Sequence, residues 1–244
     1  MNIIGIIPAR YASTRFPGKP LVMINGKSMI QRVYEQVSLS KTISKVMVAT
    51  DDDRIAKHVE RFGGNVCITS ESHNSGTDRC YEVVDTINDE FDIVINIQGD
   101  EPYINPTQID LLASCFAKKE IEIATLIKKI NNNEELLSPN VVKVVTDINK
   151  KAIYFSRFPI PYLRGCNQYE CLDKTDYYKH IGIYAYRSTT LKKIVSLPLS
   201  NLEKSESLEQ LRWLENGFSI YTAITEFESI AIDTPEDLDK LINQ

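Results

Sequence analysis

Short, almost continuous apolar runs recur along the first part of the chain. Such runs are typical of strands buried on both faces of a parallel sheet. The stretches between them repeat apolar residues every three or four positions, which predicts helices packed on that sheet. The predicted strands are 3–7, 45–50, 66–69 and 92–97, and the predicted helices are 28–37, 51–63 and 78–87. This alternation indicates βαβ units and a mainly parallel sheet, and hence an α/β fold.

The pattern changes in the middle of the chain, where aromatic and β-branched residues dominate. Such stretches occupy 141–147, 152–165 and 178–187, and a polar stretch over 165–177 joins the last two. We expect an antiparallel β-rich arm or lid over about 150–187. The last third returns to a helix, a strand and a closing helix that begins after Thr234 as N-cap. The sequence therefore predicts one domain, 1–244, that carries an arm.

Composition excludes several classes of partner. The chain has 244 residues, 43% of them hydrophobic, which is enough for a substantial core. Its net charge is 28 − 33 = −5, so no global positive field attracts nucleic acid or an anionic membrane. No apolar run approaches the roughly 18 residues of a spanning helix, and the chain opens on a strand instead of a charged leader. We expect a cytoplasmic protein.

The cysteines predict neither a disulfide framework nor a zinc site. There are five of them, an odd number, widely scattered and without CxxC spacing. Buried or idle thiols are the simplest interpretation. One pairing stays open, between Cys166 and Cys171.

The loop after the first strand concentrates positive charge. Within 8–20 it carries Arg10, Arg15 and Lys19, and its prolines make it stiff and non-helical. Ligands of an open parallel sheet lie beyond the carboxyl ends of its strands, so these cations are well placed for a triphosphate. A solvated basic surface loop explains the loop alone equally well. The sequence lacks GxGxxG and GxxxxGK[ST], which argues against a dinucleotide-binding dehydrogenase and a P-loop NTPase.

Two further stretches place polar groups where ligands bind. A buried strand in 95–102 runs directly into acidic residues, and Asp100 is the better metal candidate among them. Residues 75–79, Ser-Gly-Thr-Asp-Arg, open a helix, where Gly76 allows a polar ligand to approach the backbone. An ordinary helix capping box explains the same residues equally well.

Together with other motifs, these stretches identify a family. In chain order the motifs are IIPARYASTRFPGKPL, VATDD, SGTDR, VINIQGDEP, PNVVKVV, YFSR, HIGIYAYR, LEQLRWLE and DTPEDL. Over essentially its whole length the chain resembles the bacterial 3-deoxy-manno-octulosonate (Kdo) cytidylyltransferases, or CMP-Kdo synthetases. The resemblance implies a Rossmann-like nucleotidyltransferase fold and transfer of CMP from CTP to the anomeric 2-hydroxyl of Kdo. Pyrophosphate is released, Mg²⁺ is required, and the product serves lipopolysaccharide inner-core synthesis.

The resemblance also implies roles for individual residues. The nucleotide-binding residues are Pro8, Ala9, Arg10, Arg15, Lys19, Ser75, Gly76, Thr77, Asp78, Arg79 and Gln98. The Kdo-binding residues are Gln98, Arg157, His180, Tyr184, Glu209 and Gln210. The metal ligands are Asp100 and Asp233, and these two with Arg10 and Lys19 form the catalytic set. His180 is interpreted as a sugar contact and not as a base, since a lone histidine in an aromatic strand is more often structural.

The implied mechanism needs positioning and charge neutralisation more than a protein base. The loop cations neutralise the departing pyrophosphate, one Mg²⁺ bridges phosphate oxygens, and a second activates the sugar hydroxyl. The family also implies a homodimer that forms through the arm. Lys179 stands where the family pattern has arginine, so a bidentate contact to the Kdo carboxylate is not expected there.

Two alternative functions remain open at this point. A sister nucleotidyltransferase would use 8-amino-Kdo, a sialic acid, or a sugar or polyol phosphate in place of Kdo. A regulatory module would bind nucleotide without catalysis, and the presence of both Asp100 and Asp233 argues against it.

Overall fold

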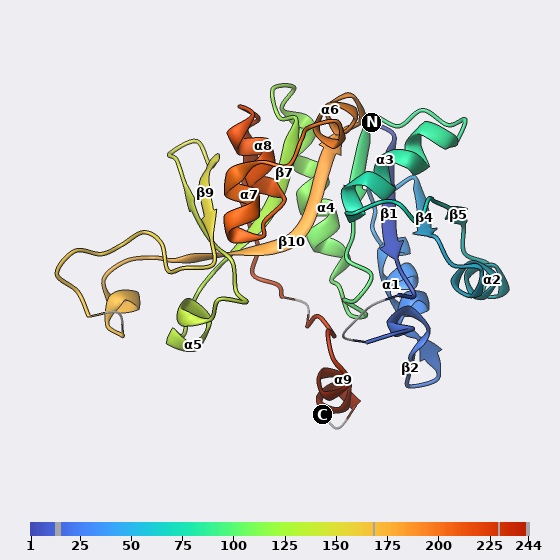
Figure 1. Cartoon of the computed structure of the whole chain (residues 1–244), viewed down its shortest axis with the longest axis horizontal. Coiled ribbons are helices and arrows are strands. Elements are labelled where there is room, and N and C mark those ends of the chain that lie inside the picture. The colour runs from blue at the N-terminus through green and yellow to red at the C-terminus, as the bar shows by residue number, and fades with distance from the viewer. Residues whose placement is uncertain (13–15, 168, 229, 243–244) are drawn as a thin grey trace.

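The computed structural model describes residues 1–12, 16–167, 169–228 and 230–242. Within these residues one large mixed sheet forms the centre of the molecule, in the order β11-β7-β10-β6-β1-β4-β5 (Figure 1). Its strands are β1 (Ile3–Ala9), β4 (Lys45–Thr50), β5 (Val66–Ile68), β6 (Ile93–Asn96), β7 (Ile123–Lys129), β10 (Tyr178–Arg187) and β11 (Ile220–Ile224). Neighbours pair in parallel except β10, which runs antiparallel to both β6 and β7. The predicted α/β class and mainly parallel sheet are confirmed.

Helices cover both faces of the sheet. One face is covered by α1 (Met29–Ser38), α2 (Asp53–Arg61) and α4 (Pro106–Ser114), and the other by α3 (Gly76–Thr86), α6 (Ser188–Val195), α7 (Asn201–Glu206) and α8 (Gln210–Glu215). Short helical turns η1 (Lys19–Leu21), η2 (Cys115–Ala117) and α5 (Asn133–Leu137) lie in the connections. The small hairpin β2 (Met23–Ile24) and β3 (Lys27–Ser28) follows η1.

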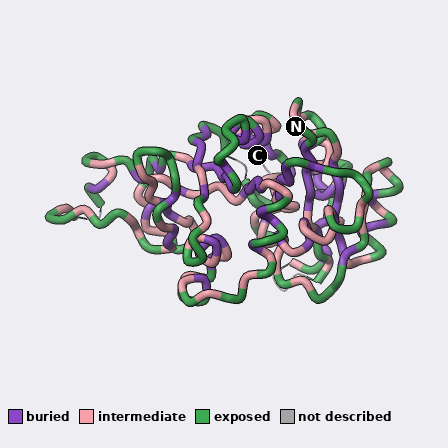
Figure 2. Tube along the Cα trace, turned by 90° about the horizontal axis from the view of Figure 1, so that it is seen from above, coloured by how far each residue is buried: buried purple, intermediate pink, exposed green. Residues whose placement is uncertain are grey.

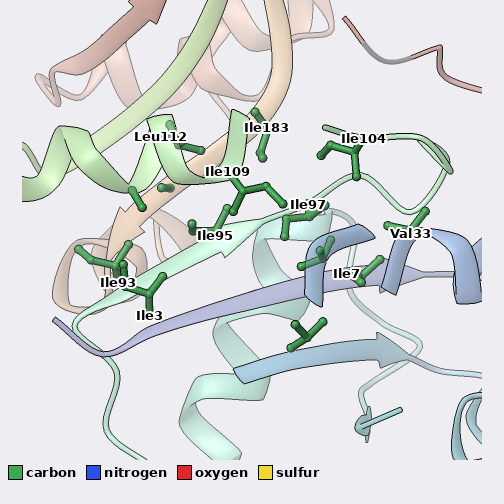
Figure 3. Close-up of a cluster of buried hydrophobic side chains, with 14 of the residues drawn as sticks. Ile3, Ile7, Val33, Ile93, Ile95, Ile97, Ile104, Ile109, Leu112 and Ile183 are labelled. Atoms are coloured by element: carbon green, nitrogen blue, oxygen red, sulfur yellow. The ribbon is translucent and has the colours of Figure 1, made fainter. Parts of the chain in front are cut away.

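The isoleucines of the first strand do not alternate with polar residues, because both faces of this strand are buried. Ile3 and Ile7 point to the α1 and α4 side, and Figure 3 shows Ile7 close to Val33 of α1. Ile4 and Ile6 point to the α3 and α6 side. All four are buried, because successive side chains of a strand face opposite sides and both sides carry helices.

The middle of the chain forms an arm that projects from the sheet. β8 (Lys143–Thr146) and β9 (Ala152–Ser156) pair as a hairpin, and β8 also pairs with the start of β10. The described residues from 157 to 177 then extend away from the core with only the short turn η3 (Cys171–Asp173), and they are largely exposed in Figure 2. The predicted arm, about 150–187, therefore overlaps the central sheet in its last ten residues, since β10 pairs with β6 and β7.

The chain crosses the carboxyl edge of the sheet after its last strand. A segment from 225 to 234 leads from β11, at the sheet edge, to α9 (Pro235–Ile242) near the loop that follows β1 (Figure 1). We call residues 225–228 and 230–234 the strap. Ile232 is fully buried against Ile24 and Met29, which fixes the end of the strap on the α1 side. Among the described residues, none of the helices is long and apolar enough to span a bilayer.

Candidate active site

Two adjoining cavities open beyond the carboxyl ends of β1 and β6. The first, which we call the loop-side cavity, has a volume of about 250 Å³. Its lining is Pro8, Ala9, Arg10, Lys19, Pro20, Asn74, Ser75, Gly76, Arg79, Gln98, Gly99 and Asp100. The strand-side cavity, of about 260 Å³, is lined by Pro8, Gly76, Thr77, Asn96, Ile97, Gln98, Gly99, His180, Gly182, Tyr184, Leu208, Glu209 and Gln210. Pro8, Gly76, Gln98 and Gly99 belong to both.

Lys19 joins two acids that are far apart in the sequence. Its Nζ lies 2.7 Å from an Asp100 oxygen and 3.3 Å from an Asp233 oxygen. Asp100 follows β6 and Asp233 ends the strap, and the N–H of Ile232 donates to the Asp100 carbonyl at 3.0 Å. The two carboxylates are therefore held beside one cation at the mouth of the loop-side cavity.

Backbone geometry directs Lys19 into this position. Gly18 has a φ of +71°, in the left-handed region, and it precedes η1 directly. Its N–H donates to the Tyr11 carbonyl at 2.9 Å, which closes the loop. A side chain at Gly18 would also press on the Tyr11 ring, since a Cβ there would lie 3.1 Å from it. Glycine at this position thus lets residue 18 lie directly against Tyr11.

The acids fit a divalent cation that shares its ligands with a substrate. The described residues contain no group of three or more His, Cys, Asp or Glu side chains suited to a metal. Asp100 and Asp233 nevertheless converge on a positive charge, the Lys19 ammonium, and they offer hard carboxylate oxygens. Mg²⁺ is commonly held by one or two carboxylates, with substrate phosphates and water as its other ligands. The donor set matches that pattern.

Gly99 and Gly76 let three segments of backbone meet between the cavities. A Cβ at Gly99 would lie 2.7 Å from the Pro8 carbonyl oxygen, a distance that real Cβ atoms do not tolerate. A Cβ at Gly76 would lie 3.3 Å from the Pro8 ring. Gly76 thus lets Pro8 approach and also lines both cavities, and its predicted role in the close approach of a ligand stays a prediction. In the sequence, Gly99 could have been singled out by its place in the Gln-Gly-Asp stretch after the strand.

The start of α3 satisfies the capping interpretation of residues 75–79. The Ser75 hydroxyl accepts from the Asp78 N–H at 3.1 Å, and the Asp78 carboxylate accepts from the Ser75 N–H at 3.1 Å. Asp78 is thus engaged in the cap and does not line either cavity. Ser75 and Gly76 still line the loop-side cavity, so the helix N-terminus faces a space that suits an anion.

Arg79 is buried beneath the loop-side cavity. Only 1% of the residue is exposed, and its guanidinium donates to Thr69 Oγ1 at 2.7 Å and to Asp51. Asp51 also lies 3.9 Å from Nε of Arg10. Sequence reasoning did not assign Asp51, although it belongs to the Val-Ala-Thr-Asp-Asp motif. The carboxylate of Asp51 therefore connects the buried arginine to the cationic loop.

The strand-side cavity gathers polar groups from β10, α3 and α8. Gln98 Nε2 donates to the Gly182 carbonyl at 2.7 Å, and Thr77 Oγ1 donates to Glu209 at 2.8 Å. Burial raises the pKa of Glu209, and the hydrogen bonds from Thr77 and Ser75 partly offset that rise. A carboxyl group of this kind is well suited to bind sugar hydroxyls, since it both accepts and, when protonated, donates.

His180 is half-buried in this cavity and neutral near pH 7. Burial lowers its pKa to about 3. Its Nε2 lies 3.0 Å from Thr125 Oγ1, whose hydroxyl donates to the Ile183 carbonyl at 2.7 Å. Aromatic contacts with Phe155 and Tyr184, at centroid distances of 5.3 and 5.0 Å, fix the ring further. An imidazole that does not titrate near neutral pH is a hydrogen-bonding contact and not a general base.

Not every predicted site residue reaches the cavities. The Arg157 guanidinium donates to the carbonyls of Pro139, Glu206 and Ser207, and the residue lines neither cavity. Its predicted role toward the sugar acid stays a prediction. Arg15 lies outside the described residues.

Lys179 forms a charged cluster that the sequence did not reveal. Only 4% of the residue is exposed, and its ammonium pairs with Glu135 at 2.9 Å and with Glu228 of the strap. Lys128 pairs with the same Glu228 at 3.1 Å. Glu228 accordingly has a lowered pKa, because the two ammonium groups outweigh its partial burial. These pairs tie the strap to β7 and β10.

Comparisons with known proteins identify the family of the chain. Residues 4–230 match the family model described as cytidylyltransferase. A 3-deoxy-manno-octulosonate cytidylyltransferase of Parabacteroides distasonis is 56% identical over 99% of this chain and 97% of its own length. That of Cytophaga hutchinsonii is also 56% identical, over 98% and 95%. A solved CMP:2-keto-3-deoxy-manno-octonic acid synthetase complexed with CTP is 43% identical, with a TM-score of 0.92 over 100% of this chain and 98% of its own.

Proposed function

Because the chain belongs to the family of 3-deoxy-manno-octulosonate cytidylyltransferases, we propose that it transfers CMP from CTP to the anomeric 2-hydroxyl of Kdo and releases pyrophosphate. One structural observation carries the proposal most directly: Lys19 and Asp100 line the loop-side cavity, which adjoins the strand-side cavity, and Asp233 joins them through the Lys19 ammonium. One cavity offers cations and a helix N-terminus, and the other offers groups that suit a polyhydroxylated acid.

The loop-side cavity is where we place the nucleotide. The backbone of 8–10 lies at its floor, and Arg10 and Lys19 provide charge-assisted hydrogen bonds to phosphate oxygens. The free amides at the start of α3 favour the negative charge of a phosphate. Arg79 supports the wall of this cavity from beneath, because Thr69 and Asp51 hold its guanidinium in place.

The strand-side cavity is where we place the sugar acid. Gln98, His180, Tyr184, Glu209 and Gln210 converge there from the end of β6, from β10 and from the start of α8. Gln98 and Gly99 belong to both cavities, so a sugar hydroxyl beside them faces a nucleotide in the loop-side cavity. Holding the two reactants in this way converts a bimolecular step into an effectively unimolecular one.

Asp100 and Asp233 are the residues that would hold Mg²⁺. When bound there, the ion supplies positive charge that offsets the phosphate oxygens and polarises the sugar hydroxyl. Lys19 then stabilises the charge that develops on the departing pyrophosphate. Neutral His180 contributes hydrogen bonding and orientation only.

Pyrophosphate release tests this proposal. The purified chain is incubated with CTP, MgCl₂ and one acceptor, and separate reactions contain Kdo, 8-amino-Kdo, N-acetylneuraminic acid or no acceptor. We expect Kdo to give the highest kcat/KM and the reaction without acceptor to give none. Faster release with 8-amino-Kdo or the sialic acid would instead identify a sister enzyme. Binding of CTP without release in any reaction would identify a nucleotide-binding module.

We also propose a homodimer that forms through the arm, in a cytoplasmic enzyme that supplies lipopolysaccharide inner-core synthesis. Large apolar side chains of the arm are exposed, namely Ile153, Phe158, Tyr162 and Tyr169. Burying such side chains against a second copy is favourable by about 25 cal/mol per Å² of apolar surface. Sedimentation equilibrium tests the dimer: a Phe158→Ser variant should dissociate at protein concentrations where the wild type is dimeric.

A further inference from the structure

Two cysteine thiols meet in the arm, away from both cavities. The Cys166 and Cys171 sulfurs each lie 3.3 Å from the carbonyl oxygen of Asn167. Both sulfurs also belong to one small apolar cluster. Both cysteines are free, as are Cys67, Cys80 and Cys115. The arm therefore holds two reduced thiols that share one backbone acceptor.

Polar side chains extend this pair at both ends. Interaction with Cys166, and next with Glu170, raises the pKa of Lys174, whose ammonium lies 3.5 Å from the Glu170 carboxylate. At the other end the Tyr177 hydroxyl contacts Cys171 and donates to the Pro161 carbonyl at 3.0 Å. Burial and the contact with Cys171 raise the pKa of Tyr177 to about 12. The tyrosine is therefore a permanent donor at neutral pH, and the lysine is a permanent positive charge beside the outer sulfur.

The two thiols differ in access. Cys171 is 7% exposed and belongs to a small apolar cluster with Ile130, Leu136 and Tyr177. Cys166 lies at the margin of that cluster and is partly exposed. Burial, and next the contact with Cys166, raises the pKa of Cys171. Since thiolates attack disulfides, the accessible sulfur beside a lysine is the attacking one and the buried sulfur is the resolving one.

We propose that Cys166 and Cys171 form a thiol–disulfide exchange site whose substrate is a low-molecular-weight disulfide. The Cys166 thiolate attacks one sulfur of that disulfide and releases the first small thiolate, which leaves a mixed disulfide on Cys166. Cys171 then loses its proton and attacks the Cys166 sulfur, and the second small thiolate leaves. Two protein thiols are oxidised to one disulfide, the small disulfide is reduced to two thiols, and these take up the two protons.

The dithiol lies away from the site proposed for nucleotidyl transfer. The exchange site lies in the excursion that follows β9, and none of its residues lines either cavity. It does contact the base of the arm, because Leu136 of α5 belongs to the same apolar cluster and the neighbouring Glu135 pairs with Lys179.

Peptide mapping of the intact protein tests the site. The full-length chain is incubated with oxidised glutathione, quenched with acid and an alkylating reagent, and digested with trypsin. Residues 165–174 form one tryptic peptide that contains both cysteines. We expect this peptide to lose two hydrogen atoms in mass and to escape alkylation, and dithiothreitol should reverse both changes. If the peptide instead stays fully alkylated, the proposal is wrong.

Two variants assign the roles of the sulfurs. Cys171→Ser should accumulate a stable glutathione adduct on Cys166, because the resolving thiol is missing. Cys166→Ser should leave Cys171 unmodified, because the attacking thiol is missing. The half-buried Cys67 is the internal reference, since its thiol lacks a second cysteine and burial raises its pKa. Adducts that form on Cys67 as fast as on Cys166 would contradict a built exchange site.

Discussion

The ammonium nitrogen of Lys19 lies 2.7 Å from a carboxylate oxygen of Asp100, although 81 residues separate the two in the sequence. A carboxylate oxygen of Asp233, which is 214 residues beyond Lys19, lies 3.3 Å from the same nitrogen. The loop after β1, the end of β6 and the strap after β11 are thereby brought to one point. A nucleotide and a sugar acid that occupy the adjoining cavities would meet there.

Removal of the Lys19 charge should slow the use of CTP. Lys19→Ala should lower kcat/KM for CTP by about 2–4 kcal/mol in transition-state free energy, or roughly 30-fold to 10³-fold. The control is Lys45→Ala, which removes a lysine paired with Asp89 at 2.6 Å. Lys45 lies at the amino end of β4, whereas the cavities lie beyond the carboxyl ends of the strands. Steady-state pyrophosphate release measures both variants. Equal kcat/KM values for Lys19→Ala and the control would contradict the role of the loop.

Loss of the buried Arg79 should destabilise the fold. Arg79→Met leaves the Asp51 carboxylate without its buried partner, and breaking such a pair costs about 3–5 kcal/mol of unfolding free energy. Urea unfolding followed by circular dichroism measures the loss. The double variant Arg79→Met/Asp51→Asn should recover part of it, because the unpaired charge is also removed. A loss below about 1 kcal/mol in the single variant would mean that Arg79 is not a structural support.

Protonation of His180 should make the protein less stable in acid. Near neutral pH the imidazole is uncharged, so its titration should not change the activity there. Its pKa is about 3 in the folded state and near 6.5 when unfolded. Between these values only the unfolded state binds the proton, so unfolding free energy falls as the pH falls from 6.5 toward 3, by up to about 1.4 kcal/mol per pH unit. His180→Gln keeps a hydrogen bond to Thr125 and should show a shallower slope in urea titrations at several pH values. An equal slope in both proteins would show that burial does not hold His180 neutral.

Lys179 should act on the metal site through the strap. Lys179→Met removes one of the two lysine partners of Glu228 and leaves Lys128, so the strap is less firmly held and Asp233 is less well positioned. We expect the Mg²⁺ concentration for half-maximal rate to rise about 10–100-fold, with rescue by Lys179→Arg. Calorimetric titration of Mg²⁺ in the presence of CTP should show the same change in affinity. The control is Lys129→Met, since Lys129 forms only an exposed pair with Asp176.

If Lys179→Met binds Mg²⁺ as tightly as the Lys129→Met control, the strap does not position Asp233. A lower melting temperature with unchanged Mg²⁺ affinity would assign Lys179 to folding alone.

Local patterns predicted the architecture well, because the core is built from them. The isoleucines of β1 and the apolar faces of α1 and α3 follow directly from periodicity. The cap formed by Ser75 and Asp78 follows from the identity and spacing of these two residues. The end of the arm was less predictable, because the mixed aromatic and aliphatic pattern of β10 does not reveal that it inserts between β6 and β7.

The site could be predicted only where motifs or family resemblance supplied it. Periodicity says nothing about two acids that meet from opposite ends of the chain, so Asp233 came from the resemblance alone. The Arg79–Asp51 pair and the Lys179–Glu228 pair were not predicted, because each depends on tertiary packing between segments with no local signal of contact. Arg157 is the opposite case. Its motif predicts a site residue, but its guanidinium donates to the backbone carbonyls of Glu206 and Pro139.

The most direct test of the account is the turnover of Asp100→Asn. This variant keeps the shape of the side chain and removes the charge that pairs with Lys19 and would hold Mg²⁺. The account predicts that kcat for pyrophosphate release from CTP and Kdo falls by about 10³-fold, the upper range for loss of one charge-stabilising group. The melting temperature should stay within the range of the Asp89→Asn control. Wild-type turnover by Asp100→Asn at saturating Mg²⁺ would contradict the account.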